Sequence, residues 1–192
     1  MLQGAWTAEA ARVISNQFDS QGFDVLCPHQ DKRTGRNGDS HVRNGHIISW
    51  VGNDLSLESQ LAFPDIAVVD RTTRKVVLLC EVEESEPQPK TVVGDILANL
   101  LGDHLTFAPN RNELLIGGWT TFSFLAKSTG KGYGIQQLRM LQQKLNQIRM
   151  NLATPNAAIK EIIIETYQVE TELQERLIRQ TKSVVNRFRN QL

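Results

Sequence analysis

The sequence predicts an α/β fold in which helices flank one mixed central β-sheet. Runs rich in β-branched residues alternate with amphipathic segments of helical length, which is the pattern of a layered α/β domain. The run from Val76 to Cys80 is apolar on both faces, as expected of a central strand covered on both sides. The 192 residues contain no convincing linker, internal repeat or low-complexity segment, so we expect a single domain over 1–192.

The elements follow from hydrophobic periodicity and from the residues that begin and end helices. Thr7 is a typical N-cap, and Gly22 follows the amphipathic segment, which predicts a helix between them. Thr91 is expected to cap a second helix after a proline-containing break. In chain order we predict helix 7–21, strands 23–28, 47–51, 63–70 and 75–83, helix 91–102, strand 113–119, helix 135–152, strand 160–166 and helix 169–190.

Three carboxylates are predicted to converge at one end of the sheet. The strands on either side of 71–74 read as an antiparallel hairpin. Residues two apart in a strand share a face, so Glu81 and Glu83 project together while Val82 points into the core. Asp65 is about as far before the turn as Glu81 is after it, so the hairpin brings them to the same end. Hard divalent cations such as Mg²⁺ bind oxygen clusters of this kind, and they can polarise a phosphoryl oxygen and activate a water.

These residues resemble a known motif. Pro64-Asp65, followed after a gap of 15 residues by Glu81-Val82-Glu83, is similar to the motif of the PD-(D/E)xK nuclease superfamily, which includes many restriction endonucleases. The resemblance implies a metal-dependent endonuclease that hydrolyses DNA phosphodiester bonds. It implies Asp65 and Glu81 as ligands of Mg²⁺, for which Mn²⁺ can substitute, with the backbone carbonyl of Val82 as a further ligand.

The resemblance also covers the order of the elements. The segments between about 7 and 120 follow the αβββαβ core of that family, and about 133–192 form an extension of helices and a strand. The implied partner is DNA, most simply a duplex, and a two-fold homodimer follows if the protein cuts palindromic sites. The alternative is a catalytically inactive member of the same fold that binds nucleic acid or protein.

Glu83 stands where the family has a lysine. A lysine would face the scissile phosphate with a positive charge, whereas two negative charges about 4 Å apart repel by roughly 4 kcal/mol at an effective dielectric near 20. The ExE form is similar to a minority of restriction endonucleases that are active with a carboxylate at this position. We expect Glu83 to act as an outer metal ligand or a general base. Lys90 is an alternative source of the missing charge, and a solvated acidic strand end is the alternative for the whole stretch.

Further candidates lie outside the hairpin. Glu9 and Glu58 could add metal ligands or could be surface acids. The segment from Gln30 to His46 is basic and rich in glycine, which indicates either a DNA-contacting loop or an ordinary surface loop. The candidates for DNA contacts in it are Lys32, Arg33, Arg36 and Arg43.

The last two predicted helices carry patterns of their own. The leucine-rich stripe of the first favours packing on the sheet, with a coiled-coil dimer seam as the alternative. The stripe consists of Leu138, Leu141, Leu145, Ile148 and Leu152. The final helix is rich in cations towards its end, where the helix dipole alone favours them. These cations are Arg176, Arg179, Lys182, Arg187 and Arg189.

Composition sets broad limits on the class of protein. Lys plus Arg equals Asp plus Glu, at 21 each, so any nucleic-acid surface must come from local charge asymmetry. Two cysteines without a spaced framework suit a reducing compartment. The N-terminus lacks the pattern of a signal peptide, and no stretch approaches 18 apolar residues. We therefore expect a cytoplasmic protein that does not enter a membrane.

Overall fold

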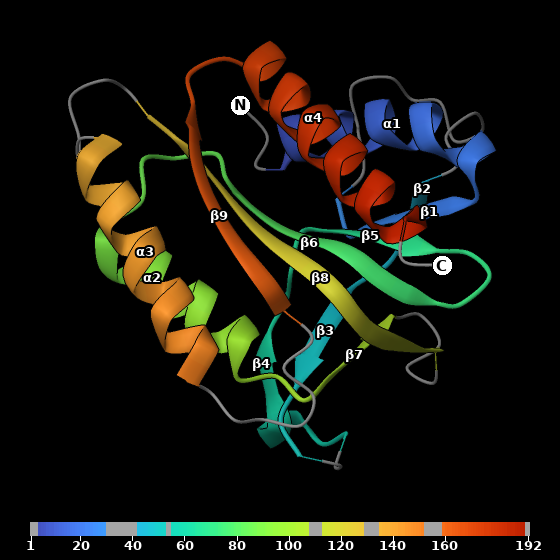
Figure 1. The fold of residues 1–192 in the computed structure, drawn as a ribbon, viewed down its shortest axis with the longest axis horizontal. Coiled ribbons are helices and arrows are strands. Elements are labelled where there is room, and N and C mark those ends of the chain that lie inside the picture. The colour runs from blue at the N-terminus through green and yellow to red at the C-terminus, as the bar shows by residue number, and fades with distance from the viewer. Residues whose placement is uncertain are drawn as a thin grey trace.

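Helices cover both faces of a mixed β-sheet in the computed structural model, which describes residues 4–29, 42–52, 55–107, 113–128, 135–151 and 159–190 (Figure 1). Helices α1 (Ala5–Phe18) and α4 (Glu170–Arg189) pack on one face, and α2 (Pro89–Leu100) and α3 (Ile135–Asn151) pack on the other. The strands are β1 (Phe23–Cys27), β2 (Val42–Asn44), β3 (Ile47–Trp50), β4 (Gln60–Ala62), β5 (Ile66–Asp70), β6 (Lys75–Glu83), β7 (His104–Phe107), β8 (Glu113–Lys127) and β9 (Ile159–Tyr167). The predicted α/β fold with a mixed sheet between helices is confirmed.

The strand directions bring three strand ends to one edge of the sheet. The strand order in the sheet is β2-β1-β5-β6-β8-β7-β3-β4. The ninth strand, β9, pairs with residues 120–127 of β8, beyond the part of β8 that pairs with β7. β5 runs antiparallel to both β1 and β6, whereas β6, β8 and β9 run parallel to one another. Parallel neighbours need a crossover connection, and α3 supplies the one between β8 and β9. The C-terminal ends of β6, β8 and β9 therefore lie side by side (Figure 1).

Two helices begin at residues other than those predicted. Helix α1 begins after Gly4, whose φ of 79° is left-handed, and Thr7 lies within the helix. The carboxylate of Glu84 accepts hydrogen bonds from the N–H and the hydroxyl of Thr7, both at 2.9 Å. A residue at the end of β6 thus supplies the acceptor that an N-cap side chain would otherwise provide. Helix α2 begins after Gln88 rather than at Thr91, because the proline that follows Gln88 suits the first turn of a helix.

The predicted hairpin of β5 and β6 is confirmed, although its first strand is shorter than predicted. The turn contains Arg74 with φ 58°, and the carboxylate of Asp70 accepts hydrogen bonds from the N–H and hydroxyl of Thr73. β5 begins only at Ile66. The chain passes from β4 to β5 through Pro64, which has no N–H to contribute to a ladder.

The remaining differences concern strands. The strand predicted over 113–119 continues to 127 as β8, because residues 120–127 pair with β6 on one side and β9 on the other. The short strands β2 and β7 were not predicted, since three or four residues are too few to show an alternating pattern. Most of the predicted basic loop, residues 30–41, lies outside the described residues.

The stripe of α3 packs on the sheet, as predicted. Leu145 is buried in the core under α2 and α3, and Leu138 and Leu141 pack against that core. Ile148 is 43% exposed, so the buried stripe ends before it. Leu152 lies outside the described residues.

No helix in the part of the chain that the structure describes is long and apolar enough to cross a membrane.

Glu84 is expected to stabilise α1 across the fold. Glu84→Ala removes the acceptor for two donors of Thr7, a residue that is only 1% exposed. We expect the free energy of unfolding to fall by about 1–2 kcal/mol in urea denaturation. Glu175→Ala, on the exposed side of α4, is the control and should stay within about 0.5 kcal/mol of wild type. Equal losses in the two variants would contradict this role for Glu84.

Candidate functional site

Asp65 and Glu81 lie opposite each other where β5 begins and β6 approaches its end. The register pairs Ile66 with Cys80, and the N–H of Asp65 donates to the carbonyl of Cys80 at 3.0 Å. Asp65 and Glu81 are therefore the next facing pair, and side chains in such a pair have Cβ atoms about 5 Å apart. Val82 packs in the core under α1 and α4, so Glu81 projects from the other face of the sheet, on the side of α2.

The Asp65 carboxylate is held by one hydrogen bond at each oxygen. Its Oδ1 lies 2.8 Å from Nε2 of His29, and its Oδ2 accepts the N–H of Val82 at 2.8 Å. The hydrogen bond to Asp65 raises the pKa of His29. Gly4 lies so close to the His29 ring that a Cβ at this position would collide with the ring.

His29 was not predicted as a site residue. It follows the buried strand β1, and β1 pairs antiparallel with β5. Leu26 faces Ala67 in that register, so the residues just after β1 lie beside those just before β5. A histidine directly after a buried strand was the available signal, but the pairing of β1 with β5 could not be read from the sequence.

Glu81 carries the most perturbed carboxyl group of the site. Burial and, in decreasing order, the negative charges of Asp65, Asp95 and Glu83 together raise its pKa to about 9. Within the described residues, no hydrogen bond to the Glu81 carboxylate is found. Near neutral pH this side chain is therefore protonated unless a cation compensates the charge around it.

Asp95 of α2 is a fourth acid at the site and was also not predicted. The neighbouring positions Val92, Ile96 and Asn99 are buried against the sheet, which places Asp95 on the inner side of the helix. Burial raises the pKa of Asp95, and the charges of Glu83 and Asp65 add to the effect. An acid within the apolar stripe of a predicted helix was a signal that could have identified it.

Glu83 turns towards the end of the strand. Its Oε1 accepts the N–H of Ser85 at 3.0 Å and the hydroxyl of Ser85 at 2.6 Å. Its backbone carbonyl accepts the hydroxyl of Tyr167 at 2.9 Å. The backbone group of Val82 that contacts the site is its N–H, bonded to Asp65, while its carbonyl stays a predicted ligand.

The donor set fits a hard divalent cation, but the side chains are not assembled around one point. Among the described residues, no group of three or more His, Cys, Asp or Glu side chains is arranged to hold a metal ion. Asp65 is engaged by His29 and Val82, and Glu83 is engaged by Ser85. Four mutually repelling carboxyl groups, one of them with a strongly raised pKa, are nevertheless the donors that Mg²⁺ and Mn²⁺ prefer.

The other predicted ligands lie apart from this cluster. Glu9 pairs with Arg12 on α1, with Oε2 accepting from Nε at 2.8 Å. Glu58 is exposed in the short helix Leu57–Ser59. Among the described contacts, neither acid touches Asp65 or Glu81. Lys90 is exposed in the first turn of α2.

The predicted basic residues fall into two groups. Lys32, Arg33 and Arg36 lie outside the described residues. Arg43 lies 3.7 Å from Asp24, with its guanidinium 5.0 Å from the centre of the Phe107 ring. Several cations of α4 pair with acids of β9. These pairs are Arg176 and Arg179 with Glu165, and Arg187 with Glu161.

Comparison of the chain with protein-family models, with curated proteins and with solved structures found no match. The chemistry of the site therefore rests on its own residues.

The raised pKa of Glu81 predicts how stability changes with pH. The unfolded chain releases this proton near pH 4.5 and the folded protein only near pH 9, so the contribution of Glu81 to stability is complete below pH 4.5 and is lost as the pH rises towards 9. Glu81→Gln removes this loss. In EDTA we expect the variant to be more stable than wild type by roughly 2 kcal/mol at pH 8 and equal to it at pH 4, in urea denaturation. Lower stability of the variant at pH 8 would contradict the account.

Proposed function

We propose that this chain is a metal-dependent endonuclease of the PD-(D/E)xK type that hydrolyses DNA phosphodiester bonds. The observation that carries the proposal is the facing pair of Asp65 and Glu81, with Asp95 beside it, which leaves Glu81 protonated without a cation. A structural role alone gives no reason to keep three carboxyl groups together, because their repulsion destabilises the folded protein.

The order of the elements supports the same proposal. Helix α1 is followed by β1, β5 and β6, which are antiparallel neighbours, then by α2, and then by β8 parallel to β6. If β2, β3, β4 and β7 are regarded as additions, this order is similar to the αβββαβ order expected of the nuclease core and so supports the proposal. Of the two proposed ligands, Asp65 directly precedes the second of the first three strands, β5, and Glu81 lies on the third, β6.

In the proposed mechanism each residue has a separate task. Asp65 and Glu81 would hold Mg²⁺ or Mn²⁺, and the ion would supply the positive charge that polarises a phosphoryl oxygen and activates a water. His29 and the N–H of Val82 fix the orientation of the Asp65 carboxylate, as hydrogen bonds to ligating carboxylates commonly do. Asp95 would be a further ligand from α2. Glu83, fastened by Ser85, accepts the proton of the attacking water or holds an outer position.

One observation favours a second function. Glu83 stands in the lysine position and is tied to Ser85, so the site lacks the positive charge that the family usually presents to the phosphate. A catalytically inactive protein of the same fold, binding nucleic acid through another surface, would need no such charge. It would bind DNA and cut none with either metal.

Cleavage of a supercoiled plasmid in Mg²⁺ or Mn²⁺ distinguishes the two functions. We expect wild-type protein to nick it, and Asp65→Asn and Glu81→Gln to be at least about 100-fold slower, because each loses a charged ligand of the activating metal. Glu175→Gln, on the exposed side of α4, is the matched control and should cut at the wild-type rate.

Two outcomes would count against the enzyme. Wild-type protein that cuts neither DNA nor RNA with either metal leaves only the binding module. An Asp65→Asn variant that cuts at the wild-type rate removes Asp65 from the active centre.

A further inference from the structure

We infer that the outer face of α3 binds the phosphodiester backbone of a nucleic acid. The inference takes its class of partner from the proposed function and adds the surface that holds the substrate. It rests on the charge of one helix, on its fixed orientation and on its place relative to the carboxylates.

The charged residues of α3 are all positive. Its 17 residues include three cations, Arg139, Lys144 and Arg149, and no Asp or Glu. Most of its other polar residues are Gln or Asn, whose amides donate hydrogen bonds to phosphate oxygens. A solvated helix of a neutral protein ordinarily mixes both signs, so a helix without acids presents an uncompensated positive surface.

The orientation of α3 is set by side-chain bonds to β9. Gln142 accepts the N–H of Ile164 at 2.7 Å, and Asn146 accepts the N–H and donates to the carbonyl of Ile162 at 3.2 and 3.0 Å. Among the described strands, β9 pairs only with β8, so these amides also cover backbone groups at this edge of the sheet. With Leu145 buried on the same side, the opposite face of α3 must point outwards.

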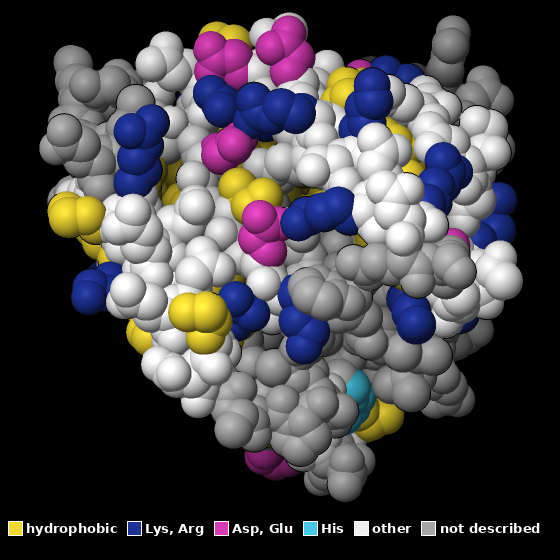
Figure 2. Space-filling view, viewed as in Figure 1, with side chains coloured by type: hydrophobic (Ala, Val, Ile, Leu, Met, Phe, Trp, Pro, Cys, Tyr) yellow, Lys and Arg dark blue, Asp and Glu magenta, His cyan; other side chains and the backbone are white. Residues whose placement is uncertain are grey.

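That outward face carries cations, amides and apolar groups. Arg139, Gln143, Lys144 and Gln147 are exposed, and Met140 is 60% exposed. In Figure 2 the part of the molecule over α3 shows Lys or Arg and hydrophobic side chains, whereas the acidic side chains of the upper half lie over α4 and β9. The alkyl groups suit the sugar rings between the phosphates that the cations would bind.

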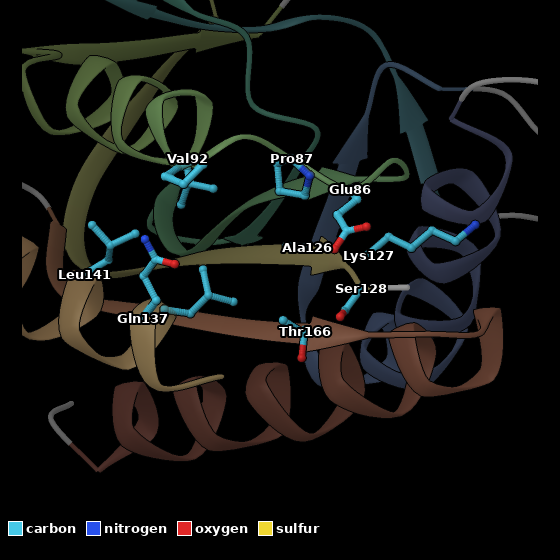
Figure 3. Close-up of a pocket in the computed structure, with 11 residues that line it drawn as sticks. Glu86, Pro87, Val92, Ala126, Lys127, Ser128, Gln137, Leu141 and Thr166 are labelled. Atoms are coloured by element: carbon cyan, nitrogen blue, oxygen red, sulfur yellow. The ribbon is translucent and has the colours of Figure 1, made fainter. Parts of the chain in front are cut away.

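Helix α3 also lies on the face of the sheet that carries the carboxylates. Both α2 and α3 cover this face, and Asp95 belongs to α2. A groove between the two helices is lined by Val92 of α2 and by Gln137 and Leu141 of α3, and it reaches Glu86 just beyond the end of β6 (Figure 3). A nucleic-acid strand bound along α3 would therefore lie beside the end of β6 that bears Glu81.

Helix α4 provides the contrast. It is also rich in cations, but Arg176 and Arg179 pair with Glu165, and Arg187 pairs with Glu161. It covers the opposite face of the sheet, together with α1. The positive charge of α4 is largely paired with acids and lies away from the carboxylate cluster. Removing two cations from α4 should therefore leave nucleic-acid binding unchanged.

The test is the salt dependence of binding to a fluorescent duplex two helical turns long, measured by anisotropy with Ca²⁺ in place of Mg²⁺. The double variant Arg139→Gln/Lys144→Gln is expected to bind roughly tenfold more weakly, with a slope of log Kd against log salt shallower by about 2. Arg139→Lys/Lys144→Arg keeps both charges and should restore binding. Arg179→Gln/Lys182→Gln, which removes two charges from α4, should bind as wild type, and melting curves check that each variant folds.

The outcomes separate this inference from the proposed function. Protein that binds DNA through α3 but cuts nothing upholds the inference and overturns the nuclease. Protein that cuts DNA while the α3 variant binds as wild type overturns the inference alone. Binding to polyglutamate with none to duplex or single-stranded DNA would overturn it as well, because the partner would then be an acidic protein.

Discussion

The repulsion between Asp65 and Glu81 is the constraint on which the rest of the site depends. The β5–β6 register places them face to face, and burial leaves little water to screen them. The conflict is resolved unequally. The Asp65 carboxylate is held by His29 and the Val82 N–H, whereas Glu81, which has no such partner among the described residues, has a raised pKa and keeps its proton. A carboxyl group with a pKa raised this strongly is typical of catalytic and metal-binding sites, whereas purely structural acids are usually paired with a cation.

The end of β6 connects this site to the stability of the fold. Glu81 faces the carboxylate cluster, Glu83 is fastened by Ser85, and Glu84 holds the first turn of α1 through Thr7. The same strand end therefore anchors a helix on one face of the sheet and carries the proposed ligands on the other. Helix α3 lies on the face of the sheet that carries the proposed metal ligands, and it presents cations without acids. We expect this face to suit a polyanion, whereas on the opposite face, under α1 and α4, cations are largely paired with acids.

Local pattern was enough to predict the hairpin, the mixed sheet and the pairing of Asp65 with Glu81, because strand periodicity and a short turn determine them. The sequence did not reveal His29 and Asp95. His29 reaches the site through the β1–β5 pairing, and Asp95 through the packing of α2, both of which are long-range contacts. The predicted cap at Thr7 was wrong for a related reason, since Glu84 is distant in sequence and replaces the local acceptor. Ladders of three or four residues, such as β2 and β7, carry too little pattern to be recognised.

The central claim is that the carboxylate cluster is a cation site that keeps a proton when the cation is absent. Calorimetric titration of Mn²⁺ at pH 7.5 in two buffers of different ionisation enthalpy tests it most directly, because the difference in heat counts the protons released. We predict that wild-type protein binds Mn²⁺ with release of about one proton per ion, and that Glu81→Gln binds more weakly and releases none. Absence of Mn²⁺ binding by the wild-type protein, or binding without proton release, would contradict the account.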